Sequence, residues 1–373
     1  MIPFNKPYLT GQEVLRISEA HALGQLSGDG HFTALCSKWL EQNTGTNRAL
    51  LTHSCTAALE MAAILLDIQP GDEVIMPSYT FVSSANAFVL RGGIPVFVDI
   101  RKDTLNIDET LIEEAITPKT KAILPVHYAG VACEMDAIME IADKHQLFVV
   151  EDAAQGIMSK YKGRSLGSIG DLGCLSFHET KNIISGEGGA LLINNEIFTK
   201  RAEMIREKGT DRTQFFRGEV DKYSWQDIGS SFLPGETMAA FLFAQLEEAQ
   251  NITNERLKIW REFDKFFSII DSKKQFLTPV IPNECETNGH LYYLLMSNNA
   301  ERENLIAYMK SKSVNCIFHY IPLHDSFAGK KYGRVATSMH VTESLASRIV
   351  RLPLWVGLDT SHVTKSFSNW NKG

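Results

Sequence analysis

The sequence alternates between apolar strands and amphipathic helices from residue 47 to residue 195, and this alternation constrains the fold more than any other feature. Short apolar runs indicate buried strands, and apolar residues at helical spacing indicate helices packed on a sheet. Such an alternation predicts a mainly parallel sheet with helices on both faces. The expected strands are 48–52, 73–76, 94–99, 121–127, 190–194 and two runs that end at Asp152 and near Phe177, and the expected helices are 56–66, 80–91 and 134–145.

The pattern changes beyond residue 200. The polar and aromatic stretch 209–225 shows no regular element, and long loops in compact domains are often functional. A long helix is expected from residue 237 to about residue 267, followed by strands at 291–296 and 314–318 with a helix at 301–312 between them. A chain of 373 residues is long enough for two domains, so we expect a large domain at 1–245 and a smaller α/β domain at 246–373.

Composition and charge argue against several classes of protein. The net charge of −7 disfavours a nucleic-acid-binding role. The sequence has no apolar run long enough for a membrane span, and its N-terminus lacks the pattern of a signal peptide, so a cytoplasmic location is expected. The six cysteines are scattered without a CxxC pair, which predicts reduced thiols and neither a metal site nor disulfides.

An acid and a lysine follow successive buried strands. Asp152 ends one apolar run, and Lys181 follows the next, just before the glycine cluster 186–189. Open α/β sheets bind ligands at the carboxyl ends of their strands, so both side chains are expected in one crevice. This pair suits pyridoxal 5'-phosphate (PLP), because the lysine forms a Schiff base with its aldehyde and the carboxylate keeps its pyridine nitrogen protonated. Taken alone, Asp152 is explained equally well as a helix N-cap.

Three further segments offer contacts to such a cofactor, each with a simpler alternative. Ser54 and Thr56 lie where a strand ends and a helix begins, a place that favours phosphate, although an ordinary helix cap also explains them. Phe81 can stack on a flat ring, and a core phenylalanine is its alternative. Ser176, at the end of the strand before Lys181, can bind phosphate, whereas His178 is more often structural.

Five motifs together resemble those of the DegT/DnrJ/EryC1/StrS family of sugar aminotransferases. They are Gly-Asp-Glu-Val-Ile-Met-Pro-Ser-Tyr-Thr-Phe (71–81), Val-Glu-Asp-Ala-Ala-Gln (150–155), Ser-Phe-His-Glu-Thr-Lys-Asn (176–182), Gly-Glu-Gly-Gly (186–189) and His-Tyr-Ile-Pro-Leu-His (319–324). The resemblance implies the fold type I (aspartate aminotransferase-like) architecture of PLP-dependent transferases, with a large, mixed, mainly parallel sheet domain and a smaller C-terminal α/β domain.

The opening Ile-Pro-Phe-Asn-Lys-Pro and the sequence Ser-Gly-Asp-Gly (27–30) look closest to one subgroup of this family. That subgroup aminates C4 of a dTDP-4-keto-6-deoxyhexose for enterobacterial common antigen or O-antigen (lipopolysaccharide) synthesis. The resemblance therefore implies L-glutamate and this sugar nucleotide as substrates, PLP and its amine form PMP as cofactor, and dTDP-4-amino-4,6-dideoxygalactose or -glucose as product. Which C4 epimer forms depends on the face that the sugar presents to the cofactor, and the sequence leaves this open.

The resemblance also implies a role for each residue at a motif position. Lys181 is the catalytic Schiff-base lysine. The residues expected to bind the cofactor are Cys55, Thr56, Phe81, Asp152, Gln155, Ser176 and, from the neighbouring subunit of a homodimer, Ser231. Tyr320 and His324 are expected near the substrate. Cys55 stands where the family usually has glycine, and Ser231 where it often has asparagine.

The long polar loop supplies the remaining candidates. A sugar nucleotide carries a diphosphate, and Arg212, Arg217 and Lys222 are expected to bind it. The alternative for each of these residues is a place in a solvated surface loop. A homodimer with shared active sites would give this loop its function.

Two other activities are alternatives for this chain. The related sugar dehydratases carry histidine where this chain has Lys181, and a PLP-binding regulator without catalysis needs a DNA-binding module for which the chain has no length to spare.

Overall fold

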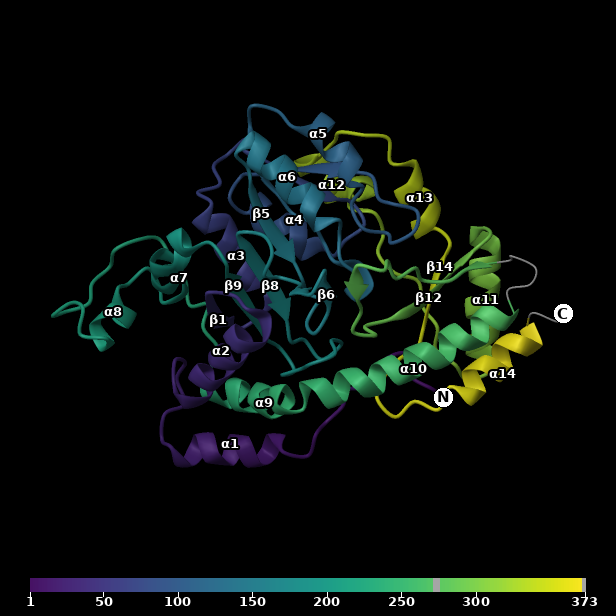
Figure 1. Cartoon of the computed structure of the whole chain (residues 1–373), viewed down its shortest axis with the longest axis horizontal. Helices are drawn as coiled ribbons and strands as arrows, with labels where there is room; N and C mark the ends of the chain where they lie inside the picture. The colour runs from purple at the N-terminus through teal and green to yellow at the C-terminus, as the bar shows by residue number, and fades with distance from the viewer. Residues whose placement is uncertain (271–275, 371–373) are drawn as a thin grey trace.

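The computed structural model describes residues 1–270 and 276–370 and has an eight-stranded sheet at its centre (Figure 1). The strand order is β1-β9-β8-β5-β4-β2-β3-β13, and β9 runs antiparallel to both of its neighbours while the other pairs are parallel. The predicted mixed, mainly parallel sheet is therefore confirmed. The strands are β1 (Arg48–Thr52), β2 (Glu73–Pro77), β3 (Ile94–Val98), β4 (Thr120–Ile123), β5 (Phe148–Asp152), β8 (Leu172–Ser176), β9 (Gly189–Ile193) and β13 (Arg334–Val335).

Helices cover both faces of this sheet, because successive strand residues point to opposite sides. Leu50 and Val150 pack in one core with α3, α4 and α7, whereas Leu51 and Val149 pack in the other with α2, α6 and α9. Nearly all of the strand residues are buried, as expected for a sheet covered on both sides. The helices are α1 (Glu13–Ala22), α2 (His31–Thr44), α3 (Cys55–Leu65), α4 (Val82–Val89), α5 (Ile112–Ala115), α6 (Met135–His145), α7 (Thr199–Arg206), α8 (Arg212–Phe216) and α9 (Glu236–Glu247).

A second core lies in the C-terminal part of the chain. An antiparallel sheet of order β10-β12-β14 packs with α10, α11 and α14, and its apolar cluster is separate from those of the large sheet. A small third sheet has the order β11-β6-β7. The elements are β6 (Lys160–Tyr161), β7 (Arg164–Ser165), α10 (Ala249–Ile270), β10 (Phe276–Leu277), β11 (Cys285–Glu286), β12 (Tyr292–Met296), α11 (Asn299–Ser311), α12 (Phe327–Tyr332), α13 (His340–Ala346), β14 (Ile349–Leu352) and α14 (Ser361–Trp370).

Three expected elements differ from the structure. The long helix is divided at Glu248, whose N–H bonds to Gln245 three residues back and tightens the last turn of α9 before α10 begins. The stretch 314–318 is not a strand, because its only bridges in the described chain go to two separate segments, at Ile2 and at Arg351. The loop 209–225 contains one short helix, α8. The division at 245/246, which falls at the end of α9, stays a proposal.

Two kinds of feature are absent from the described residues. No helix among them combines the length and the apolar character needed to cross a membrane. No group of three or more His, Cys, Asp or Glu side chains within 1–270 and 276–370 is arranged to hold a metal ion.

Candidate active site

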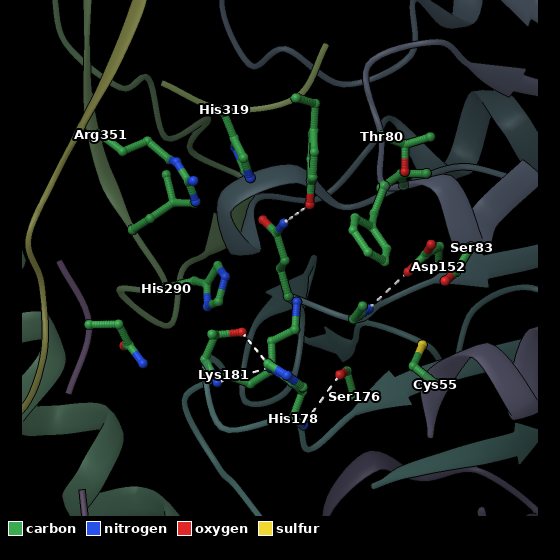
Figure 2. Close-up of a pocket in the computed structure, with 18 of the residues that line it drawn as sticks. Cys55, Thr80, Ser83, Asp152, Ser176, His178, Lys181, His290, His319 and Arg351 are labelled. Carbon is green, nitrogen blue, oxygen red and sulfur yellow. Dashed lines mark hydrogen bonds between the residues drawn. The ribbon is translucent and has the colours of Figure 1, made fainter. Parts of the chain in front are cut away.

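The carboxyl ends of β5 and β8 open into a cavity of about 810 Å³. Its walls come from both parts of the molecule, with Asp152 and Cys55 on one side and Arg351, His290 and His319 on the other (Figure 2). This volume is typical of sites for small molecules and cofactors. The position at the carboxyl ends of parallel strands is where open α/β sheets bind their ligands.

Asp152 is held in place from two directions. Its Oδ2 accepts a hydrogen bond from Ser84 Oγ at 2.6 Å, and its Oδ1 accepts one from the Ala154 N–H at 3.2 Å. The bond to Ala154 resembles a capping contact, but the residues that follow form turns and no helix begins there. The N-cap alternative therefore does not account for Asp152. Its carboxylate lies in the wall of the cavity, where it can pair with a cationic group of a ligand.

Lys181 reaches the same cavity from the loop after β8. Burial lowers the pKa of its ammonium group, and the positive charge of Arg351 lowers it further, whereas Cys55 and Asp152 oppose the shift. A lysine with a lowered pKa is more often neutral, and only the neutral amine is a nucleophile or a base. The pocket thus favours the reactive form of this side chain.

The glycines after Lys181 have a packing reason. A Cβ at Gly189 would collide with the backbone of Ser54 and Cys55, and one at Gly188 would collide with Ser185 Oγ. Gly189 therefore lets the start of β9 pass directly against the start of α3. Gly188 itself lines the cavity, so close packing of this segment shapes the cavity wall.

The start of α3 is both a helix cap and part of the cavity wall. Ser54 is the N-cap and its Oγ accepts a hydrogen bond from the Ala57 N–H at 3.1 Å. Thr56 Oγ1 lies 2.8 Å from Ser83 Oγ, and Cys55 is the first residue of the helix. Burial raises the pKa of the Cys55 thiol well above its usual value, so this group is neutral. The free N–H groups of a first helical turn attract a phosphate.

Four more of the expected residues line the cavity, namely Phe81, Gln155, Ser176 and Tyr320. The Phe81 side chain is 57% exposed, which rules out the core alternative and leaves an aromatic ring facing open space. Gln155 bonds through Nε2 to Tyr320 Oη at 2.9 Å, and its Oε1 accepts from the Ala129 N–H at 2.7 Å. Gln155 therefore connects the large sheet to the segment that carries Tyr320.

Five expected residues lie outside the cavity of the single chain: Ser231, Arg212, Arg217, Lys222 and His324. Arg212 pairs with Glu207 at 3.1 Å, and Arg217 pairs with Glu203 at 2.9 Å. His324 Nδ1 lies 2.7 Å from Ser78 Oγ. The loop around α8 projects away from the sheet beyond α7, and a bridge between Glu207 and Ser231 closes its base (Figure 1). The proposed ligand contacts of these residues stay predictions.

Several cavity residues were not singled out from the sequence, namely Phe4, Asn5, Arg256, His290, His319 and Arg351. They come from the N-terminal segment and the small domain, and only tertiary packing brings them here. His290 Nδ1 lies 2.9 Å from the Asn182 Oδ1, and Asn182 Nδ2 donates to the Asn288 carbonyl. The Asn182 oxygen is thus the acceptor, which places the His290 proton on Nδ1 and leaves Nε2 as an acceptor.

The chemistry of these groups fits PLP. Asp152 can hold a protonated pyridine nitrogen, Phe81 offers an aromatic face, and Lys181 offers an amine for the aldehyde. The start of α3, with Thr56 and Ser176, offers N–H and O–H donors for a phosphate. Burial, together with the positive charges of Lys181 and Arg351, lowers the pKa of His290 and of His319 well below its usual value. Both rings are therefore neutral, and they leave the positive charge of the cavity on the arginines.

Comparisons with known proteins agree with this chemistry. The DegT/DnrJ/EryC1/StrS aminotransferase family model matches residues 7–368. The spore coat polysaccharide biosynthesis protein SpsC of Bacillus subtilis is 32% identical, over 97% of this chain and 94% of SpsC. The protein MJ1066 of Methanocaldococcus jannaschii is 35% identical, over 83% of this chain and 82% of its own. The solved PMP-form of Spr1654 from Streptococcus pneumoniae, assigned as a sugar aminotransferase, has a TM-score of 0.91 at 26% identity and covers 100% of this chain and 99% of its own, and its PLP-form has a TM-score of 0.90.

Proposed function

Since the chain belongs to the DegT/DnrJ/EryC1/StrS aminotransferase family, whose members use PLP, we propose that it transfers the amino group of L-glutamate to C4 of a dTDP-4-keto-6-deoxyhexose. The product would be dTDP-4-amino-4,6-dideoxygalactose or its glucose epimer. One observation carries the aminotransferase chemistry, namely that Lys181 and Asp152 face the same cavity from successive strands of the sheet.

Several observations support a sugar nucleotide as the acceptor. The relative SpsC acts in spore coat polysaccharide biosynthesis, and Spr1654 is assigned as a sugar aminotransferase. The opening motif, which resembles that of the C4-aminating subgroup, contributes Phe4 and Asn5 to the cavity wall. A cavity of about 810 Å³ has room for more than a small amino acid. We therefore assign the enzyme to surface polysaccharide synthesis in the cytoplasm, with the O-antigen of lipopolysaccharide as the expected product class.

Each side chain has a defined task in this proposal. PLP, when bound, supplies an electron sink that weakens the C–H bond at the substrate carbon. In the first half-reaction, Lys181 Nζ removes the proton from the reacting carbon of the amino donor. In the second, it delivers a proton to C4 of the sugar. Asp152 holds the pyridine N–H through its carboxylate, which Ser84 and Ala154 orient. Phe81 would pack on the ring. Cys55, Thr56 and Ser176 would hold the phosphate, and Gln155 would contact the ring hydroxyl.

We also propose a homodimer with shared active sites. The loop 209–225 projects from the body of the chain and carries exposed aromatic side chains, including Phe216 and Trp225. Such a loop has too much apolar surface to be left in water without cost. In a dimer it would bring Ser231 to the partner's cofactor phosphate, and Arg212, Arg217 and Lys222 to the diphosphate of the sugar nucleotide. Tyr320 and His324 would contact the substrate from the subunit that holds the cofactor.

A direct assay tests the proposed reaction. The PLP-loaded enzyme is incubated with L-glutamate and dTDP-4-keto-6-deoxyglucose, and the product is identified by NMR. The coupling constants at C4 distinguish an equatorial from an axial amine and so decide between the two epimers. Lys181→Ala serves as the inactive control. Amination at another carbon, or of a different nucleotide sugar in preference to this one, would refute the proposed substrate.

A further inference from the structure

Two arginines reach the cavity without an acidic partner. Arg351, on β14, forms no ion pair with any carboxylate of the described chain, and its Nε and Nη2 both donate to the Phe318 carbonyl, at 3.2 and 3.1 Å. Arg256, on α10, is buried and bonds only to the carbonyls of Gly289 and His290 among the described residues. Buried charges in proteins are usually paired. Two guanidinium groups that line one cavity and pair with no carboxylate of the described residues indicate a binding site for an anion.

Arg351 is fixed in a geometry that suits such a ligand. The Phe4 ring lies 4.7 Å from its guanidinium carbon, and the Phe318 carbonyl holds one of its edges. The Phe4 segment is in turn anchored by Trp355, whose Nε1 donates to the Pro3 carbonyl at 3.2 Å. The side chain points into the cavity in Figure 2, which leaves Nη1 for a ligand. A rigid guanidinium with free N–H groups matches the oxygens of a carboxylate well.

The position of Arg351 favours a ligand group close to the reacting carbon. Arg351 lines the same cavity as Lys181, and His290 lies between their labelled side chains in Figure 2. An amino acid carries its carboxylate one bond from the carbon that reacts. In a sugar nucleotide the hexose ring separates the diphosphate from C4, so the diphosphate would extend much farther away.

The cofactor does not satisfy this charge. The groups offered to its phosphate, at Ser176 and the start of α3, lie across the cavity from Arg351 in Figure 2. We propose that Arg351 binds a carboxylate of the amino donor and so selects an amino acid for the first half-reaction. This inference rests on the proposed aminotransferase function. It adds a specificity residue from the small domain, opposite the residues that hold the cofactor.

The test separates the two half-reactions. Arg351→Gln removes the charge but keeps an N–H group for the Phe318 carbonyl, and Arg351→Lys keeps the charge but loses the planar fork. Binding of glutarate to the PLP-loaded enzyme is measured by calorimetry, and the half-reaction with L-glutamate is followed in single-turnover spectra. Glutarate is a dicarboxylate without an amine, so its binding reports recognition without catalysis. For Arg351→Gln we expect about a ten- to hundredfold weaker affinity for glutarate and L-glutamate.

The control variant is Arg348→Gln, three residues earlier and outside the cavity, which should leave glutarate binding unchanged. Binding of dTDP should be nearly equal in all variants. If Arg351→Gln does not fold, Arg351→Lys carries the test, and we expect it to lose part of the affinity because the fork is gone. Unchanged glutarate affinity in a folded Arg351 variant overturns the inference. Weaker dTDP binding with unchanged glutarate binding also overturns it, by assigning Arg351 to the nucleotide, and leaves the proposed function standing. If the wild type reacts with L-glutamate but never aminates the dTDP sugar, only the proposed acceptor falls.

Discussion

Lys181, which we propose as the catalytic lysine, lies in a site that disfavours its positive charge. Burial lowers the pKa of Lys181, and Arg351 adds to the shift, although Asp152 opposes it. A protein gains nothing in stability from such a group, but a base and nucleophile must be neutral to act. Across the cavity, Ser84 and Ala154 donate hydrogen bonds that hold the Asp152 carboxylate in place.

The cost of burying Lys181 is measurable in the cofactor-free protein. Its lowered pKa means that the unfolded chain binds the proton more tightly than the folded chain does. The free energy of unfolding therefore rises with pH between the lowered pKa and the usual value of 10.5, and the full penalty applies below this window. Lys181→Met should be the more stable protein at pH 7, and the difference should shrink as pH approaches 10.5. Urea unfolding of both proteins across this range checks it, and a difference independent of pH would contradict it.

Asp152→Asn should separate catalysis from folding. The substitution removes the charge that holds the pyridine N–H and weakens a charge-assisted hydrogen bond worth roughly 1.5–3 kcal/mol. We expect kcat to fall by at least about a hundredfold, because a neutral pyridine is a poorer electron sink. The melting temperature of the cofactor-free protein should change little, since the amide oxygen can still accept from the Ala154 N–H and the Ser84 hydroxyl can turn to accept from the amide nitrogen. A variant with the wild-type kcat would show that Asp152 is only a structural residue.

Individual elements show where sequence patterns are informative. Strands and helices of the large sheet were predictable because their apolar residues form local patterns, a continuous buried run in β5 and a periodic buried face in α6. The stretch 314–318 has the composition of a strand, but its two bridges go to different segments, which no local pattern encodes. Asp152 and Lys181 were candidates from the sequence because Asp152 ends one buried run and Lys181 lies in the loop after the next. Arg351 and His290 were not, because they reach the cavity from the small domain only through packing.

The loop around α8 permits a test of shared active sites. Gly209, at its base, has a φ of +78°, and a Cβ there would collide with the Asp227 carbonyl, so Gly209→Val should displace the loop. If the loop serves the partner's site, each homodimer is inactive, either through Lys181→Ala or through Gly209→Val. Mixed dimers should regain up to about a quarter to a half of the wild-type activity per dimer, because one of the two sites in each heterodimer has both parts intact.

Confirmed heterodimers without activity would rule out sharing. The matched control is Gly218→Val at the exposed tip of the loop, where no atom lies within 4 Å of a Cβ.

The opening residues of the chain pack against its C-terminal elements. Ile2 N donates to the Ser313 carbonyl at 2.7 Å, and Ile2 packs against the apolar cluster that contains α14. Along the chain, the elements from α1 to α9 therefore lie between two segments that pack in the C-terminal core. The division at 245/246, which groups Ile2 with the large sheet, stays a proposal, and an extended opening segment has no periodicity that would reveal its packing partner.

Removal of residues 2–6 should affect binding more than folding. Among the described residues, none of 2–6 belongs to the two apolar clusters of the large sheet, and Asn5 Nδ2 donates to the Glu179 carbonyl in the loop after β8. Phe4 covers one face of Arg351. A cation–π contact is worth about 0.5–2 kcal/mol, so glutarate affinity should fall about two- to thirtyfold. Circular dichroism should show an unchanged fold, and calorimetry measures the affinity. Unchanged affinity would mean that Phe4 does not help to hold Arg351.

The attachment of Ile2 also determines how this protein would respond to mechanical load. A force applied at residue 1 and at α14 is carried first by the short bridge between Ile2 and Val314, and not by the central sheet. Only two backbone hydrogen bonds flank this bridge, from Ile2 N and from Asn315 N. In a pulling experiment the first, low-force event should therefore detach the opening segment and draw Phe4 away from Arg351. The enzyme would lose its grip on the amino donor while both domains were still folded.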